Sequence, residues 1–178
     1  MTYPEFLDWA DEDTLAEWVA LPGEDVGEVV MTSPASKQHQ DITSFLYQMI
    51  LGYTRPRHLG EVIQAPFQMK LEHGREPDLL FVASEHLDRL GETRLDGPAD
   101  LVVEIVSPGP DSVERDRGKK FYEYEQGGVP EYWLLDPQVR RAEFYSLAGG
   151  AYRLAFSGED GVYRSKVLPG FWLRVEWL

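Results

Sequence analysis

Cysteine is absent from this chain of 178 residues, which excludes disulfide bonds and zinc sites built on thiolates. No apolar stretch reaches the roughly 18 residues that a membrane-spanning helix requires. The first residues, Met1 to Glu5, also lack the basic start and apolar core of a secretory signal. From these absences we expect a cytoplasmic protein that does not associate with membranes.

Lysine and arginine are absent from the first 31 positions, which hold nine acidic residues. The other 147 residues hold 31 − 9 = 22 acids and all 17 basic residues, so their balance is −5 against −14 for the whole chain. We interpret the acidic segment as a solvated surface. Its charge weakens an expectation of nucleic-acid binding without excluding it, because the local potential is what steers an anionic ligand.

The chain length and a hydrophobic content of 43% suit one folded domain with a sizeable core. The hydrophobic periodicity predicts the following elements: short helices within 5–20, a strand at 28–31, a helix from Ser33-Pro34, a strand or bent hairpin at 59–71, strands at 79–82 and 101–106, a helix from the loop 107–112 to about 126, a strand at 131–135, a hairpin at 142–156 turning at Gly149-Gly150, and a last strand at 171–177. From residue 33 to residue 136 the order is helix, strand, strand, strand, helix, strand. This order predicts an α/β (α+β) fold with a mixed sheet.

Two acidic residues belong to adjacent apolar runs. Asp78 opens the run 79–82, and Glu104 lies inside the run 101–106. A carboxylate buried in a strand is costly unless it is paired, hydrogen-bonded or bound to a metal. Both could share one Mg²⁺, with the backbone carbonyl of Ile105 as a third oxygen ligand. The alternatives are a turn or cap for Asp78 and a buried salt bridge to a nearby arginine for Glu104.

A lysine on the next helix is a candidate partner of these acids. The inward stripe of that helix is expected to contain Val113, Arg117, Phe121 and Tyr124. At about 100° per residue, Lys120 falls beside this stripe, whereas Lys119 falls on the solvent side. Phosphodiester hydrolysis needs a cation near the attacking water or the scissile phosphate, a role that Lys120 could take. Alternatively, Lys120 covers apolar surface with its stem while its ammonium reaches water.

Three further polar residues are candidates for accessory roles. His39 and Gln38 lie three and four residues before Ile42, so both extend the apolar stripe of the first long helix toward its start. A helix N-terminus attracts anions, so this pair could contact phosphate or a metal-bound water. A histidine on an apolar face is more often a hydrogen-bonded core residue. Glu28, on the preceding strand, could be a further metal ligand.

These motifs occur together in a known family. The matching segments are Gly27-Glu28, Ser33-Pro34, His39-Gln40, Pro77 to Val82, Asp100 to Pro108, Asp116 to Lys120, Tyr124, Gly128-Val129 and Glu131 to Trp133. In this order, from about Gly27 to Gly170, the chain resembles the Uma-two family, also called domain of unknown function 820. The resemblance implies a restriction-endonuclease-like fold with the PD-(D/E)xK nuclease core.

The resemblance also implies roles for individual residues. In the usual nuclease motif the lysine sits two residues after the glutamate, a position that is Val106 here. In this family a helix lysine takes over, and Lys120 matches it. We therefore expect hydrolysis of DNA phosphodiester bonds with Mg²⁺ or Mn²⁺ as cofactor, catalysed by Asp78, Glu104 and Lys120.

The expected organisation is one restriction-endonuclease-like domain over residues 1–178. It would comprise an acidic helical extension (1–26), a nuclease core (27–136) and a β-hairpin extension (137–178). A nuclease-fold protein that binds nucleic acid or a protein partner without cutting is the main alternative, and a hydrolase of another phosphate ester is a third. A homodimer is also possible, because Phe171, Trp172 and Trp177 could form an interface, although they could equally be core.

Overall fold

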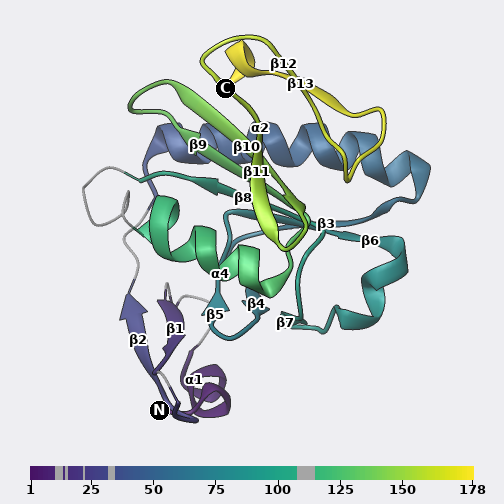
Figure 1. Cartoon of the computed structure of the whole chain (residues 1–178). Coiled ribbons are helices and arrows are strands. Elements are labelled where there is room, and N and C mark those ends of the chain that lie inside the picture. The colour runs from purple at the N-terminus through teal and green to yellow at the C-terminus, as the bar shows by residue number, and fades with distance from the viewer. Residues whose placement is uncertain (11–13, 15, 22, 32–34, 108–114) are drawn as a thin grey trace.

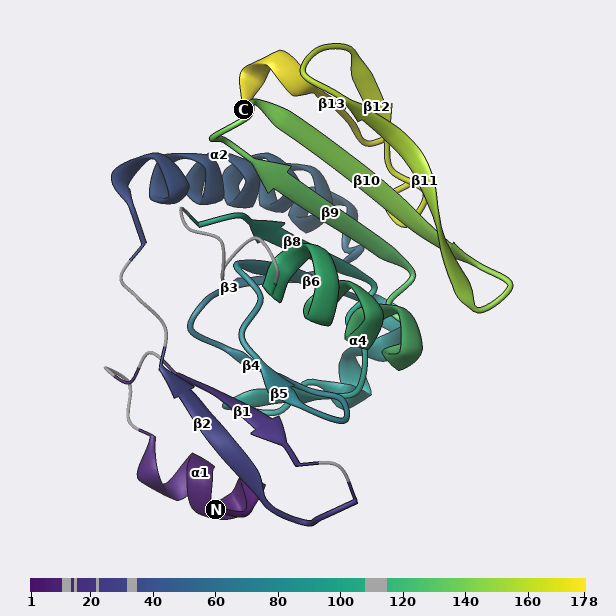
Figure 2. The same ribbon diagram turned by 60° about the vertical axis from the view of Figure 1, so that its left-hand side comes forward.

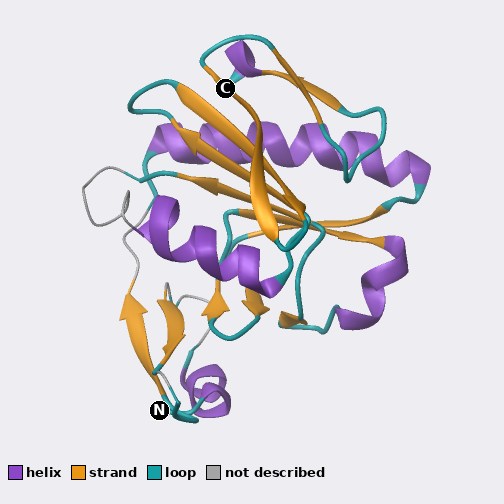
Figure 3. Cartoon of the chain, viewed as in Figure 1, coloured by secondary structure: helices purple, strands orange, loops and turns teal. Residues whose placement is uncertain are grey.

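In a computed structural model, the chain is described over residues 1–10, 14, 16–21, 23–31, 35–107 and 115–178 (Figure 1). Strands dominate the structure (Figure 3). The helices are α1 (Tyr3–Trp9), α2 (Lys37–Thr54) and α4 (Lys120–Gly127), with the short 3₁₀ or π-helical segments η1 (Arg55–Arg57), η2 (Ser84–Arg89), η3 (Arg115–Lys119) and η4 (Val175–Trp177). The strands are β1 (Ala16–Ala20), β2 (Gly27–Met31), β3 (Gly60–Gln64), β4 (Gln68–Lys70), β5 (Gly74–Arg75), β6 (Leu79–Ala83), β7 (Arg94–Asp96), β8 (Leu101–Ile105), β9 (Glu131–Asp136), β10 (Arg141–Ala148), β11 (Ala151–Gly158), β12 (Val162–Arg164) and β13 (Trp172–Arg174).

A six-stranded mixed sheet forms the centre, in the order β11-β10-β9-β8-β6-β3. The pair β8 and β9 is parallel, and the other pairs are antiparallel. Helix α2 covers one face and α4 the other (Figure 2). Because both faces are covered, every residue of β8 and β9 is buried, which explains their nearly continuous apolar sequences. The predicted α/β fold with a mixed sheet is confirmed.

The alternation of side chains along β8 determines what each face receives. Val103 and Ile105 pack in the core on the α2 side, whereas Val102 packs in the core on the α4 side. Since successive side chains point to opposite faces, Glu104 is directed toward α4. The sequence of this strand therefore places one acid in the layer between the sheet and α4.

Helix α2 begins at Lys37, with Ser36 as its N-cap accepting a hydrogen bond from the backbone N–H of His39. The predicted start at Ser33-Pro34 lies outside the described residues. The predicted apolar stripe is confirmed, because Ile42, Leu46 and Ile50 are buried against the sheet. Among the described helices, none is long and apolar enough to cross a membrane.

The N-terminal segment differs from the prediction of short helices within 5–20. Helix α1 ends at Trp9, and 16–20 form strand β1, which pairs with β2 and β5 in a second sheet ordered β2-β1-β5-β4-β7. Trp18 on this strand packs on Tyr3, with ring centroids 5.3 Å apart. Aromatic and β-branched residues favour a strand once a pairing partner exists, and this tertiary pairing prevails over local periodicity. The described part of 1–26 therefore combines a helix with a strand and is not helical throughout.

Two other predicted segments are only partly correct. The segment 59–71 does not form one strand or hairpin, because β3 joins the central sheet and β4 joins the second sheet. The predicted hairpin at Gly149-Gly150 is confirmed, and its strands β10 and β11 continue the central sheet. The last strand is shorter than predicted, since β13 ends at Arg174 and the helical turn η4 follows.

Candidate active site

The ends of β6 and β8 bring Asp78 and Glu104 into register. Leu79 pairs with Val103, so one step further along these antiparallel strands Asp78 stands opposite Glu104. The backbone N–H of Ile105 donates a hydrogen bond of 2.6 Å to Oδ2 of Asp78. The N–H and C=O of a strand residue point to the same side, so the Ile105 carbonyl is also directed toward Asp78. The two acids predicted as partners thus occupy neighbouring backbone positions on adjacent strands.

His39 contacts the other carboxylate oxygen of Asp78. Its Nε2 lies 3.1 Å from Asp78 Oδ1, and its side chain is buried in the first turn of α2. The hydroxyl of Thr43 donates to the His39 carbonyl and lies 3.5 Å from His39 Nδ1. The predicted inward position of His39 is confirmed, and the residue is both hydrogen-bonded in the core and in contact with Asp78.

Glu104 forms a buried ion pair with Lys120. The ammonium of Lys120 lies 3.0 and 3.1 Å from the two carboxylate oxygens, and both residues are 3% exposed. The hydroxyl of Tyr124 donates a 2.6 Å hydrogen bond to Oε1 of Glu104. Burial and the charge of Glu104 raise the pKa of Tyr124 well above its usual value, so this hydroxyl stays a neutral donor.

The helical phase predicted for the two lysines is correct. Lys120 points inward and Lys119 is exposed. The alternative, in which the ammonium of Lys120 reaches water, is wrong. The alternative of a buried salt bridge for Glu104 is correct as geometry, with Lys120 as the partner.

Glu17, which the sequence did not single out, also binds Lys120. Its Oε1 lies 2.9 Å from Lys120 Nζ, and its Oε2 accepts a 2.9 Å hydrogen bond from Arg75. Glu17 is 1% exposed, so the expectation of a solvated acidic segment is wrong for this residue. A signal was present, because Glu17 interrupts the apolar run 16–20 just as Glu104 interrupts its own strand. Assignment of 5–20 to helices obscured it.

The ion pairs around Glu17 extend to a second point on α4. Arg75 donates two hydrogen bonds of 2.7 Å to Glu123, and the backbone N–H of Glu76 donates to Oε1 of Glu17 at 3.3 Å. Burial alone would raise the pKa of Glu17, but the charges of Lys120 and Arg75 lower it to about 2. Glu17 is therefore ionised at neutral pH, and the network ties β1, β5 and β8 to α4.

Glu76 provides a prediction on the pH dependence of stability. Burial, together with the nearby charge of Glu17, raises the pKa of Glu76 from its ordinary value of 4.5 to about 7. Between these two values the folded protein binds more protons than the unfolded chain, so this group lowers stability as pH rises from 4.5 to 7. Glu76→Gln keeps an acceptor for Gln68 and should increase the free energy of unfolding at pH 8 by about 1–2 kcal/mol.

The measurement is urea denaturation of both proteins at pH 4.5 and pH 8. The variant should gain on the wild type at the higher pH and differ little at the lower. An equal difference at both values would contradict the raised pKa.

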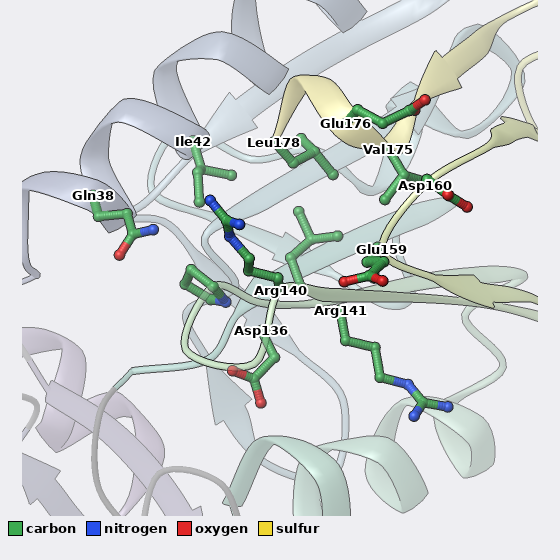
Figure 4. Close-up of a pocket in the computed structure, with 13 residues that line it drawn as sticks. Gln38, Ile42, Asp136, Arg140, Arg141, Glu159, Asp160, Val175, Glu176 and Leu178 are labelled. Atoms are coloured by element: carbon green, nitrogen blue, oxygen red, sulfur yellow. The ribbon is translucent and has the colours of Figure 1, made fainter.

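Gln38 does not join the site. Its side chain is exposed and lines a cavity of about 430 Å³, which Asp78, Glu104 and Lys120 do not line. Figure 4 shows Gln38 and Arg140 reaching toward each other across this cavity, from α2 and from the turn between β9 and β10. The predicted inward position is wrong because the buried face of α2 is centred near Leu46. Gln38 lies about 80° from that centre at 100° per residue.

Glu28 lies near the site in the sheet but is exposed. On β2 it pairs with Val19, and Val30 pairs with Glu17, so Glu28 and Glu17 share one face of the sheet. The side chain of Glu28 is nevertheless exposed, whereas that of Glu17 is buried. Its accessory role stays a prediction.

Four basic residues lie within 115–120, which in the sequence indicates a site for an anionic ligand. In the structure this segment is less available to such a ligand. Arg117 lies 3.1 Å from Asp136 and also forms an ion pair with Glu143. Lys120 is buried against two carboxylates. Of the two lysines, Lys119 is the exposed one.

The oxygen donors at this site suit a hard divalent cation. The candidate donors are the carboxylates of Asp78 and Glu104 with the Ile105 carbonyl, and Mg²⁺ is commonly held by one or two carboxylates plus waters. Within the described residues, no group of three or more His, Cys, Asp or Glu side chains is placed to hold a metal ion.

The charges of the cluster point in the same direction. Lys120 contacts the carboxylates of Glu104 and Glu17, and Arg75 contacts those of Glu17 and Glu123. This network therefore contains more carboxylates than basic side chains. Such a surplus of acids favours a cation over an anion as ligand.

The mixed sheet lies between two helices, and Glu104 on β8 meets Lys120 on α4. This arrangement is that of a restriction-endonuclease-like fold. A crystal structure from Anabaena variabilis ATCC 29413, described as "a putative nuclease belonging to DUF820", has a similar fold with a TM-score of 0.78 at 17% identity. The alignment covers 99% of this chain and 96% of that one. The chain belongs to the Uma2 family, described as "putative restriction endonuclease", whose profile matches residues 3–176. No significant match occurs among curated proteins.

Proposed function

We propose that this protein is a nuclease that hydrolyses DNA phosphodiester bonds with Mg²⁺ or Mn²⁺. The observation that carries the proposal is the pairing of Glu104 with Lys120 inside the fold, beside Asp78. A buried acid and a buried lysine are costly to maintain, because both charges lose their contact with water. Membership of the Uma2 family supports the nuclease class.

Asp78, Glu104 and the Ile105 carbonyl would hold the cation. When bound, the cation would supply Lewis-acid activation of the phosphodiester and of the attacking water. Asp78 is the more accessible of the two acids, with a side chain that is 18% exposed. A cation could therefore approach the carboxylate of Asp78 from solvent.

Lys120 and His39 would act on these ligands from within the protein. Lys120 orients the carboxylate of Glu104, and its ammonium would stabilise negative charge on the phosphate or position the water. His39 fixes one oxygen of Asp78, while the Ile105 N–H fixes the other. Both acids are thus pre-oriented by the protein.

A protein of this fold that binds nucleic acid or a partner without cutting is the second candidate. The observation that favours it is that both oxygens of Glu104 already contact Lys120, so the pair is satisfied as a structural ion pair. The net charge of −14 also favours weak association with DNA. Binding of Mn²⁺ by the isolated protein separates the two candidates.

The homodimer stays a prediction. Phe171 is buried and stacks on Trp133, so it belongs to the core and not to an interface. Trp172 and Trp177 are 44% and 45% exposed and lie against each other. These two side chains are the ones that could contact a second copy.

The test is nicking of supercoiled plasmid by the purified protein. Mg²⁺ or Mn²⁺ should support nicking, and excess EDTA should abolish it, since the carboxylates would lose the cation. Melting temperature measured with and without EDTA controls for loss of fold. A folded protein that nicks at the same rate in EDTA would contradict the cation dependence, and one that never nicks would favour the second candidate.

A further inference from the structure

Glu17 occupies a position that charge compensation alone does not require. Arg75 already forms a two-point contact with Glu123, and Lys120 already contacts both oxygens of Glu104. Removing the charge of Glu17 would therefore leave each cation with a carboxylate. The contact of Glu17 with Lys120 therefore matters for the position of the ammonium and not for its neutralisation.

The carboxylate of Glu17 is itself fixed from three directions. It contacts Lys120 on α4, Arg75 on β5, and the backbone N–H of Glu76. The residue is almost fully buried on β1, where it pairs with Val30 of β2, and the next residue, Trp18, pairs with β5. A carboxylate held in this way can serve as a fixed reference point for a flexible lysine.

Glu104 cannot serve two partners fully. Lys120 contacts both of its oxygens, and Tyr124 donates to one of them. If Glu104 acts as a metal ligand, at least one of these oxygens must be shared or released by the lysine. The contact from Lys120 to Glu17 does not depend on Glu104, so it can persist.

We infer that Glu17 is a positioning residue that anchors the ammonium of Lys120 while Glu104 serves as a metal ligand. The inference rests on the proposed function for its catalytic consequence. It makes the N-terminal strand β1 part of the active site, although β1 lies outside the segments that carry the nuclease motif. The α1–β1–β2 segment would therefore contribute to catalysis and not only to stability.

The experiment compares Glu17→Gln with a matched control, Glu131→Gln. Glu131 is another fully buried carboxylate, bound by Trp133, Tyr163 and Ser165, and it packs near the far end of β9. The first readout needs no cation and no cleavage. It is the rate at which acetic anhydride labels Lys120 in protein treated with EDTA, measured by mass spectrometry against the exposed Lys119 of the same molecule.

In Glu17→Gln the labelling of Lys120 relative to Lys119 should rise at least about fivefold, because a loosened ammonium leaves its buried position more often. In Glu131→Gln the ratio should stay at the wild-type value. The second readout is nicking under cation saturation, where Glu17→Gln should lower kcat by about 10- to 100-fold and leave KM for plasmid nearly unchanged. Glu17→Ala, which removes the carboxylate altogether, should show the same pattern more strongly.

Two results would overturn the inference. One is a Lys120 labelling ratio in Glu17→Gln equal to that of Glu131→Gln. The other is a wild-type kcat in Glu17→Gln. If the wild type does not nick plasmid at all, the proposed function fails, while the labelling ratio still decides whether Glu17 anchors Lys120.

Discussion

Lys120→Ala is expected to lower the free energy of unfolding by about 3–5 kcal/mol, because it leaves two buried carboxylates without their shared cation. Glu104 and Glu17 are 3% and 1% exposed, so water cannot replace the ammonium without local opening of the fold. Tyr124 still donates to Glu104, and Arg75 still binds Glu17, which limits the loss. Urea denaturation of the cation-free protein at neutral pH measures the effect.

The neighbouring lysine provides the matched control. Lys119→Ala removes an exposed side chain of the same type and should change stability by less than about 0.5 kcal/mol. In a double variant, adding Glu17→Gln to Lys120→Ala should recover part of the loss, since it removes the charge of one of the two buried carboxylates that lost the lysine. A Lys120→Ala protein as stable as Lys119→Ala would contradict the buried ion-pair network.

Loss of cleavage by Lys120→Ala does not by itself show that Lys120 is catalytic. A Lys120→Ala protein that does not nick DNA could be inactive because it is partly unfolded. Its activity is informative only at a temperature where circular dichroism shows the native fold. For that reason the acid at position 104 is the better first target for testing catalysis.

The part of the site that could be predicted from sequence rests on local periodicity. The strand pattern places Asp78 and Glu104 at the ends of adjacent buried strands, and the helix pattern separates Lys120 from Lys119. Both patterns depend on residues within one element. These predictions therefore do not depend on how the rest of the chain folds.

The part that could not be predicted depends on pairing between distant segments. Glu17 reaches Lys120 because β1 pairs with β5, across more than fifty positions of sequence. Nothing within 16–20 specifies that partner, and the surrounding acids favour a surface interpretation. The family resemblance began at about Gly27, so it did not include Glu17 either, whereas the family profile extends over residues 3–176.

Gln38 shows a limit of the periodicity itself. Its angular distance from Ile42 is small, but the buried face of α2 is centred on the other side of Ile42, toward Leu46 and His39. An apolar stripe gives the direction of a helix face only to within about one residue, or about 100°. Residues at the edge of the stripe are therefore assigned correctly only when the packing is known.

Glu104→Gln is expected to reduce plasmid nicking by about 10³-fold or more while retaining the fold. An amide is a neutral and weaker ligand than a carboxylate for a hard divalent cation, so both the ligand and its charge are lost. The fold should persist because Lys120 keeps the carboxylate of Glu17, and the amide oxygen still accepts a hydrogen bond from Tyr124. Single-turnover nicking with saturating Mn²⁺ measures the rate, and calorimetric titration with Mn²⁺ should show affinity weakened at least about tenfold.

Glu131→Gln again serves as the control that separates the loss of a metal ligand from a general loss of stability. It removes the charge of a buried acid on the opposite face of the sheet, so it should change stability without changing Mn²⁺ affinity. Nicking by Glu104→Gln at the wild-type rate would place the chemistry elsewhere in the molecule or in a contaminant. Loss of nicking with unchanged Mn²⁺ affinity would keep Glu104 in the reaction but remove it from the ligand set, and Asp78 would then be the acid to test as the principal ligand.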